Sequence, residues 1–167
     1  NYSSGMHDTT VVSESDDLTN FDNAFDKETT TKIDCSKVKA TYLTSPMGNG
    51  FENITAFVFP ANLANISTSE GVLSGCKELA NIAFPTVYCD ISHPESFLAN
   101  STFVNGLELP YTLTFVPMVS VDGQTGVEEI KRNEILKGSH VVGNLNIKAA
   151  TTNKCVVYVN KETTSLV

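Results

Sequence analysis

The residues with the most evident chemistry are the four cysteines, Cys35, Cys76, Cys89 and Cys155. None belongs to a Cys-x-x-Cys pair, and no histidine lies at metal-ligand spacing from one, so the sequence does not predict a zinc site. An even number of widely spaced cysteines is typical of a disulfide framework in an oxidising compartment. Four buried free thiols are the alternative. Of the three pairings that four cysteines allow, we expect Cys76–Cys89, which closes a short loop, and Cys35–Cys155, which joins the first core strand to one of the last.

Serine, histidine and carboxylate side chains do not form a catalytic pattern along the chain. Nucleophilic catalysis needs Ser or Cys beside a base, but the neighbours Ser139 and His140 would point to opposite faces of a strand. His93 lies before a proline, as a turn residue does. The adjacent Glu128 and Glu129 diverge on either a strand or a helix, so they indicate a solvated corner more than a glycosidase pair. We therefore predict no catalytic residues and no enzyme activity.

Charge and hydropathy exclude several further classes of function. The 11 basic residues are scattered singly in a chain of net charge −8, whereas nucleic-acid binding needs a basic stripe. No run approaches the roughly 18 consecutive apolar residues of a membrane span. Asp16, Asp17, Asp22 and Asp26 could offer oxygen ligands to calcium, but they lack the spacing and the glycine of an EF-hand. We expect neither a metal nor a cofactor, and no nucleic-acid partner.

Four Asn-x-Ser/Thr sequons begin at Asn1, Asn53, Asn65 and Asn100. Because the chain holds 15 Asn, and 34 of its 167 residues are Ser or Thr, about three sequons are expected by chance. The sequons are therefore consistent with secretion but do not indicate it on their own. If glycans are present, we expect them on Asn65 and Asn100, which lie in loop-like stretches, more than on Asn53, which falls in an expected strand.

Residues 1–31 form an acidic N-terminal arm. Seven carboxylates against one basic residue give the arm a charge of −6, which leaves −2 for the rest of the chain. Such a composition is typical of disordered tails, but residues 9–13 are β-prone and three apolar residues recur at the spacing of one helical face. We expect the arm to contact its own body or a neighbouring copy through Val11, Val12, Leu18, Phe21 and Phe25.

The elements that would position these residues are mostly short strands. We expect them at 38–44, 51–59, 86–91, 101–105, 111–116, 119–121, 141–149, 155–159 and 163–167, with 128–136 as a strand or one helical turn. The first two are expected to pair as a hairpin. Val72 to Phe84 has apolar residues at helical spacing and ends at Pro85, which predicts a short helix. Residues 60–71 and 92–100 are expected loops.

This pattern predicts a mainly β protein. Charged residues make up only 18% of the chain, and strands with turn signals at roughly 8–12 residue spacing are typical of a sandwich or barrel. We expect an Ig-like or jelly-roll-type β-sandwich with one short helix, made of the arm (1–31) and a disulfide-stapled domain (32–167). No internal repeat is apparent.

Two functions fit these expectations best. The first is a structural subunit of an extracellular filament, pilus-like fibre or coat, in which the arm adds a strand to a neighbouring copy. The second is a cell-surface adhesion or receptor-binding glycoprotein domain that contacts a receptor or glycan through loops 60–71 and 92–100, with the arm folded on its own body. A hydrolase of unrecognised type is a third. The arm favours the first, with an extracellular or cell-surface location.

Overall fold

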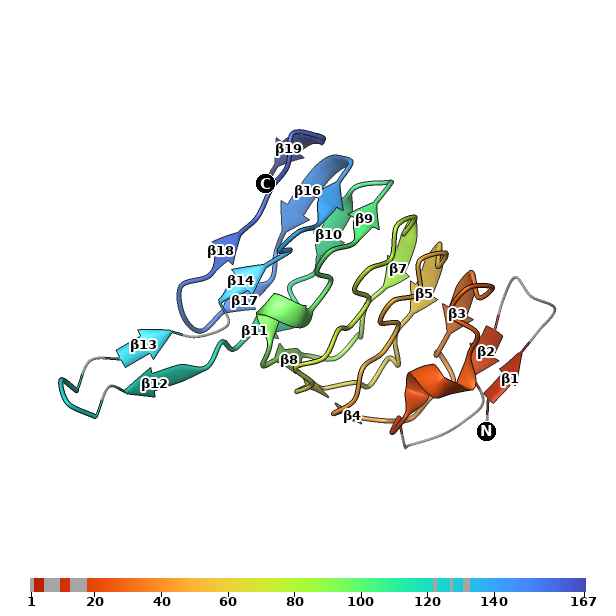
Figure 1. The fold of residues 1–167 in the computed structure, drawn as a ribbon, viewed down its shortest axis with the longest axis horizontal. Coiled ribbons are helices and arrows are strands. Elements are labelled where there is room, and N and C mark those ends of the chain that lie inside the picture. Colours follow the sequence, from red (N-terminus) through yellow and green to blue (C-terminus); the bar gives the residue numbers. More distant parts are fainter. Residues whose placement is uncertain (1, 5–9, 13–17, 122, 127, 131–132) are drawn as a thin grey trace.

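The chain folds as a β-solenoid of about five turns in a computed structural model, which describes all residues except 1, 5–9, 13–17, 122, 127 and 131–132. Figure 1 shows the turns, called coils below, stacked side by side from the N-terminal to the C-terminal end, with one hairpin projecting from the stack. Strands in neighbouring coils pair in parallel, so each residue lies beside its equivalent in the next coil.

Two rows of strands run the length of the stack. The first row, called the first face, consists of β3 (Lys32–Asp34), β5 (Ala56–Val58), β7 (Asn81–Ala83), β10 (Leu107–Leu109), β16 (Gly143–Ile147) and β19 (Thr163–Leu166). The second face consists of β4 (Tyr42–Leu43), β6 (Asn65–Ile66), β8 (Cys89–Ile91), β11 (Leu113–Phe115) and β17 (Ala150–Thr151). The second face is one continuous sheet, whereas the first face is divided between β7 and β10.

The remaining elements close the coils and cover the N-terminal end. Two parallel pairs complete the later coils: β9 (Thr102–Phe103) with β15 (His140–Val141), and β14 (Glu134–Ile135) with β18 (Val156–Val157). β1 (Tyr2–Ser4) and β2 (Thr10–Val12) extend the first face beyond β3, and β12 (Val119–Val121) with β13 (Glu128–Ile130) forms the projecting antiparallel hairpin. The 3-10 helices are η1 (Phe21–Ala24) and η2 (Pro94–Ser96).

Each coil turns one corner through two residues in the left-handed backbone region. These pairs are Gly48 and Gly50, Leu73 and Gly75, Leu98 and Asn100, and Leu136 and Gly138. A leucine in this region costs roughly 1–2 kcal/mol. Burial offsets the cost, because Leu73 and Leu98 are fully buried and their N–H groups donate to Met47 and Val72 carbonyls of the preceding coil at 2.9 and 2.8 Å.

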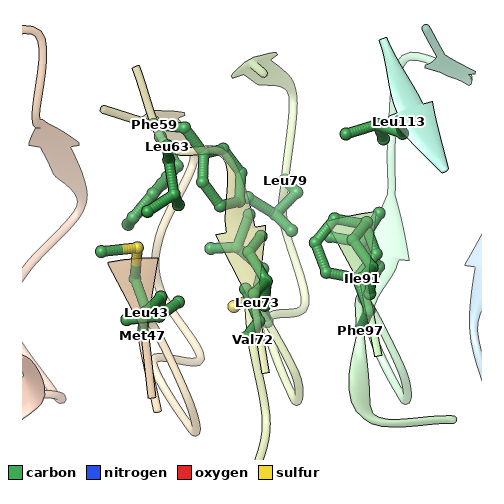
Figure 2. Close-up of a cluster of buried hydrophobic side chains, with 14 of the residues drawn as sticks. Leu43, Met47, Phe59, Leu63, Val72, Leu73, Leu79, Ile91, Phe97 and Leu113 are labelled. Carbon is green, nitrogen blue, oxygen red and sulfur yellow. The ribbon is translucent and has the colours of Figure 1, made fainter. Parts of the chain in front are cut away.

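The core is a column of apolar side chains along the solenoid axis. Figure 2 shows that successive coils contribute neighbouring side chains, with Leu43, Leu73 and Ile91 from three consecutive coils. Aromatic rings continue the column, since the Phe59 ring lies 5.7 Å from that of Phe84. The inner coils bury large side chains against both neighbours, and this stacking holds the fold together.

The predicted Ig-like or jelly-roll sandwich is wrong, although the mainly β composition is confirmed. Sandwiches and solenoids both consist of short strands separated by turns. They differ in the partner of each strand, which the alternation of apolar residues does not reveal. The expected hairpin of 38–44 with 51–59 does not form, because β4 pairs with β6 and β5 with β3 and β7, all in parallel.

The predicted helix over 72–84 is absent as well. Its apolar residues Val72, Leu73, Cys76 and Leu79 are buried around the inside of a corner, and the segment ends in β7. At this corner the inward-facing residues follow one another at intervals of three or four. The same intervals separate the residues on one face of a helix. No helix among the described residues is long and apolar enough to cross a bilayer.

Candidate functional site

The four cysteines are free thiols, so the predicted pairs Cys35–Cys155 and Cys76–Cys89 are not formed. Cys35 directly follows β3 in the first complete coil, whereas Cys155 directly precedes β18 near the C-terminal end, with the other coils stacked between them (Figure 1). Burial raises the pKa of the Cys76 and Cys89 thiols to about 12 and that of Cys35 further still. These three groups are therefore protonated core residues, unsuited to nucleophilic attack or metal binding.

Cys76 occupies a repeated position that serine fills in the next two coils. Its thiol lies 3.4 Å from the Gly48 carbonyl, while the hydroxyls of Ser101 and Ser139 donate to the carbonyls of Leu73 and Leu98. Each acceptor is the first left-handed residue of a corner in the preceding coil. A small buried donor is what this position needs, which explains a cysteine without a disulfide partner.

The histidine and acidic candidates do not form a catalytic arrangement in the described part of the chain. Ser139 is buried and His140 is exposed, as expected for neighbours on a strand, and His140 Nδ1 instead lies 2.9 Å from Glu162 Oε1. The side chains of Glu128 and Glu129 lie outside the described residues. No group of three His, Cys, Asp or Glu residues that could hold a metal occurs among those described.

The sequon asparagines are placed differently from the expectation. Asn53 lies in an exposed turn, where its amide donates to the Glu28 carbonyl at 2.6 Å, and Asn65 lies half-buried in β6. Asn100 is exposed at a corner, and Asn1 lies outside the described residues. Glycosylation at these sites stays a prediction.

The N-terminal arm folds onto its own body. The predicted β-prone run forms β2, which pairs in parallel with β3, where Val11 is the register partner of Asp34; the side chains of Val11 and Val12 lie outside the described residues. Leu18 and Phe21 are buried in the core cluster, and Phe25 packs against it. Leu18, Phe21 and Phe25 therefore cover the N-terminal end of the stack.

Asp22 completes this cap electrostatically. Its carboxylate accepts hydrogen bonds from the N–H groups of Gly48 and Asn49 at 2.7 and 3.0 Å. In later coils, the N–H group at the position of Gly48 donates to a carbonyl of the preceding coil, as Leu73 does to Met47. Asp22 thus replaces the missing preceding coil for this corner. Burial raises its pKa above the ordinary value, despite the two N–H donors that lower it.

The feature best suited to binding is a groove in the first face, between β7 and β10. These strands belong to consecutive coils but are the end strands of two separate sheets, with no ladder between them. The groove has a volume of about 530 Å³, within the range of about 300–1,000 Å³ typical of ligand sites. It is lined by Leu79, Ala80, Asn81, Ile82, Phe84, Pro85, Thr86, Phe103, Asn105, Gly106, Leu107, Glu108, Pro110, Tyr111 and Thr112.

A shift of one residue in the strand register explains the groove. The bridge of Leu79 with Phe103 sets a register in which inward-facing Ile82 would oppose Gly106. The buried side chains of β10 are instead those of Leu107 and Leu109, so the inward-facing position comes one residue later than Gly106. Side chains alternate between the two faces of a strand, so after this shift an inward-facing residue of β7 would lie beside an outward-facing residue of β10. This mismatch prevents the two strands from pairing. Ile82 and Phe84 consequently remain only partly buried and line the groove.

The groove has one charged lining residue and a rim with an exposed tyrosine pair. Glu108 is the one charged residue among its lining residues, and its carboxylate lies 3.3 Å from Lys148 Nζ and 3.2 Å from Asn146 Nδ2. Tyr111 is exposed on the rim, and its ring centroid lies 6.2 Å from that of Tyr88, which is also exposed. The groove therefore combines an apolar floor, an aromatic edge and one carboxylate.

Sequence reasoning missed the groove because it missed the repeat. The dipeptides Phe59-Pro60, Phe84-Pro85 and Leu109-Pro110 recur at equal intervals along the chain and mark the ends of β5, β7 and β10. The interval between the bridged residues Leu79 and Phe103, by contrast, is shorter by a single position. This difference is the sequence signal of the broken ladder.

Comparison with known proteins supplies neither a family nor a relative. No protein-family model, curated protein or solved structure matches this chain. The groove and the face in which it lies are the features of this protein that bear on its function.

Proposed function

We propose that this protein is a non-enzymatic recognition domain, which acts in adhesion or receptor binding by holding a partner protein against its first face. The observation that carries the proposal is the groove between β7 and β10. A solenoid can pair every coil with the next, and this one leaves a single junction of the first face unpaired within the described sheets. A ligand-sized opening with an aromatic rim lies at that junction.

The side chains around the groove support close approach by a partner. The outward residues of β5 and β7 are Ala56, Val58, Asn81 and Ala83. They are short and uncharged, so a partner can contact the sheet without displacing long charged side chains. Low charge and exposed tyrosine are also typical of the central part of protein interfaces.

The chemistry of the groove favours binding over catalysis. Its lining residues include no Cys, His, Ser or Lys. The hydroxyls of Thr86 and Thr112 are engaged with the Ala61 and Pro85 carbonyls. One carboxylate without a second acid, base or nucleophile matches a recognition site.

The extracellular or cell-surface location is kept as part of this proposal. It no longer has the support of disulfides, because all four cysteines are free. A cell-surface receptor is the expected partner, and contact with a glycan is the alternative.

A structural subunit is the second candidate, because the last coil exposes apolar residues. Val156, Val159, Leu166 and Val167 are all more than half exposed, and β19 is the end strand of its sheet. An uncovered strand edge can pair with another copy. The arm is a weaker means of assembly than the sequence suggested, since β2 already pairs with β3 of its own chain.

Binding of the labelled protein to intact cells tests the proposal. We expect saturable binding that Ala83→Arg reduces by about tenfold or more, because a long charged side chain would block the first face. Asp90→Arg, on the second face, is the matched control and should leave binding unchanged. Equal binding by both variants, or no saturable binding, contradicts the proposal. Sedimentation of the unmodified protein as a strict monomer at high concentration rejects the structural subunit.

A further inference from the structure

We propose that the groove binds an extended, basic peptide segment of the partner protein, which lies between β7 and β10 as an added strand. The inference rests on the proposed recognition function and specifies its ligand. Strand addition draws its affinity from main-chain hydrogen bonds and its specificity from the side chains beside them.

On one side of the groove, β7 presents unpaired main-chain groups. Asn81 donates its N–H to the Thr55 carbonyl at 3.1 Å, and the Ala83 carbonyl accepts from the Phe59 N–H at 2.9 Å. The main-chain groups of both residues therefore point toward β5. Alternate residues of a parallel strand address opposite neighbours, so the N–H and C=O of Ile82 point into the groove.

The other side is constructed in the same way. The Leu109 carbonyl accepts a hydrogen bond from the Lys148 N–H at 2.9 Å, and Leu107 and Leu109 are paired in register with Leu145 and Ile147. The main-chain groups of these two residues of β10 therefore point toward β16. The main-chain groups of Glu108 consequently point toward β7, and a donor and an acceptor face the groove from each side.

The chain itself closes the groove at both ends. The Val104 N–H donates to the Leu79 carbonyl at 2.8 Å before the groove, and the Cys89 N–H donates to the Thr112 carbonyl at 2.8 Å after it. These bonds hold the two coils at ladder spacing on either side of the break. An external segment that pairs with Ile82 and Glu108 must fit between these closing bonds, so its length is limited to a few residues.

Charge identifies the class of segment. Glu108 carries the one charge of the lining, within a protein of net charge −8. Its partner Lys148 is about half exposed, so a cationic side chain of a ligand can compete for the carboxylate. The rings of Tyr88 and Tyr111 offer a face and an apolar edge to the stem of Lys or Arg. Main-chain amide groups at strand spacing favour a peptide over a glycan, whose backbone carries no N–H and C=O groups at that spacing.

The test uses the full chain and three synthetic peptides: Ac-TVKVRVT-NH2, its acidic analogue Ac-TVEVEVT-NH2, and Ac-TVKPRVT-NH2, which lacks one N–H. We expect micromolar binding of the first peptide by fluorescence anisotropy. The acidic peptide would be repelled by Glu108 and the proline peptide lacks one main-chain donor, so each should bind at least about tenfold more weakly, a loss of about 1.4 kcal/mol or more. Bound peptide should slow hydrogen exchange of the Ile82 and Glu108 amides. Glu108→Gln should weaken binding of the basic peptide about three- to tenfold, whereas Glu52→Gln, which removes an exposed partner of Lys77, should not.

Several outcomes would overturn the inference. These are no binding of the basic peptide at about 1 mM, equal binding of the acidic peptide, binding without protection of the two amides, or binding of oligosaccharides in place of peptides. The two proposals fail separately. Ala83→Arg that abolishes cell binding while the peptides do not bind leaves recognition by the first face intact and removes strand addition. If the peptide binds with protected amides but cell binding is insensitive to Ala83→Arg, strand addition stands and recognition of cells by the first face is rejected.

Discussion

Cys76 shows how one repeated position can be filled by chemically different residues that do the same work. Its thiol, like the hydroxyls of Ser101 and Ser139, approaches a carbonyl of the preceding coil, and its own N–H donates to Ser101 Oγ at 3.1 Å. The residue is conspicuous in the sequence as a cysteine, but its role is that of a buried hydrogen-bond donor. Its chemistry as a thiol is suppressed by burial, which raises its pKa to about 12.

Substitution of Cys76 tests this role. Cys76→Ser retains a small donor and should change the free energy of unfolding by less than about 1 kcal/mol, while Cys76→Val leaves the Gly48 carbonyl unsatisfied and should cost about 1–3 kcal/mol. Urea unfolding of both variants measures the difference, with Cys155→Ser, a half-buried position, as the control. A loss in Cys76→Ser equal to that in Cys76→Val would refute a donor role.

Asp22 predicts the direction of a pH dependence. Its pKa is raised mainly by burial, so the folded protein retains a proton that the unfolded chain has already released. Stability contributed by this group is fully present below the ordinary carboxyl pKa and is lost as pH rises through the raised folded pKa. Unfolding free energies of the unmodified protein and of Asp22→Asn, measured across the acidic range, should show the unmodified protein losing stability relative to the variant as pH rises. The opposite trend would show that the hydrogen bonds from Gly48 and Asn49 outweigh burial.

At the scale of elements, the β12–β13 hairpin is an insertion into an otherwise regular coil. The left-handed corner residues Leu98 and Leu136 lie much farther apart along the chain than the preceding pair, Leu73 and Leu98. The hairpin accounts for the additional length, and it projects from the stack (Figure 1). An isolated two-stranded hairpin has little stability of its own, so the solenoid does not depend on it.

Deletion of residues 119–131 should therefore leave the solenoid folded. In the shortened chain, Leu136 follows Leu98 at the same interval at which Leu98 follows Leu73. We expect an unchanged far-ultraviolet circular dichroism spectrum per residue and a melting temperature within about 4 °C of that of the full chain. Loss of cooperative melting would mean that the hairpin is required for folding.

At the scale of the whole molecule, stability is transmitted from coil to coil and depends on the ends. Solenoid coils contact only their neighbours, so an end coil without a cover exposes its part of the core. Leu18, Phe21 and Phe25 cover the N-terminal end, and Asp22 satisfies its corner. The acidic composition of the arm conceals this structural role.

Phe21→Ala tests the cap. Phe21 is fully buried, so its truncation should cost about 3–5 kcal/mol. Hydrogen exchange should accelerate first in β3 and β5, close to the cap, and less in β16. Tyr42→Ala is the matched control, because Tyr42 is 61% exposed and its loss should stay within about 0.5 kcal/mol. Uniform acceleration along the whole stack would contradict an end cap.

Much of the local structure was readable in the sequence. The expected strand 119–121 forms β12, and the segment 128–136, expected as a strand or one helical turn, contains β13 and β14. Of the two alternatives for the arm, its own body is the one that Leu18, Phe21 and Phe25 contact. The helix over 72–84 was not distinguishable from a corner, because both place apolar residues three or four apart. The groove depends on a register shift between segments of two consecutive coils, which no local pattern contains.

Composition and alternation by themselves determined that this chain is mainly β, and that it lacks a basic stripe. The reason is that strand propensity and charge are properties of each residue and its near neighbours. Only the tertiary structure decided that strands pair in parallel across coils, that Cys76 is a buried donor, and that β7 and β10 stay apart. Each of these depends on which residues far apart in the sequence become neighbours, because those contacts determine burial and strand register.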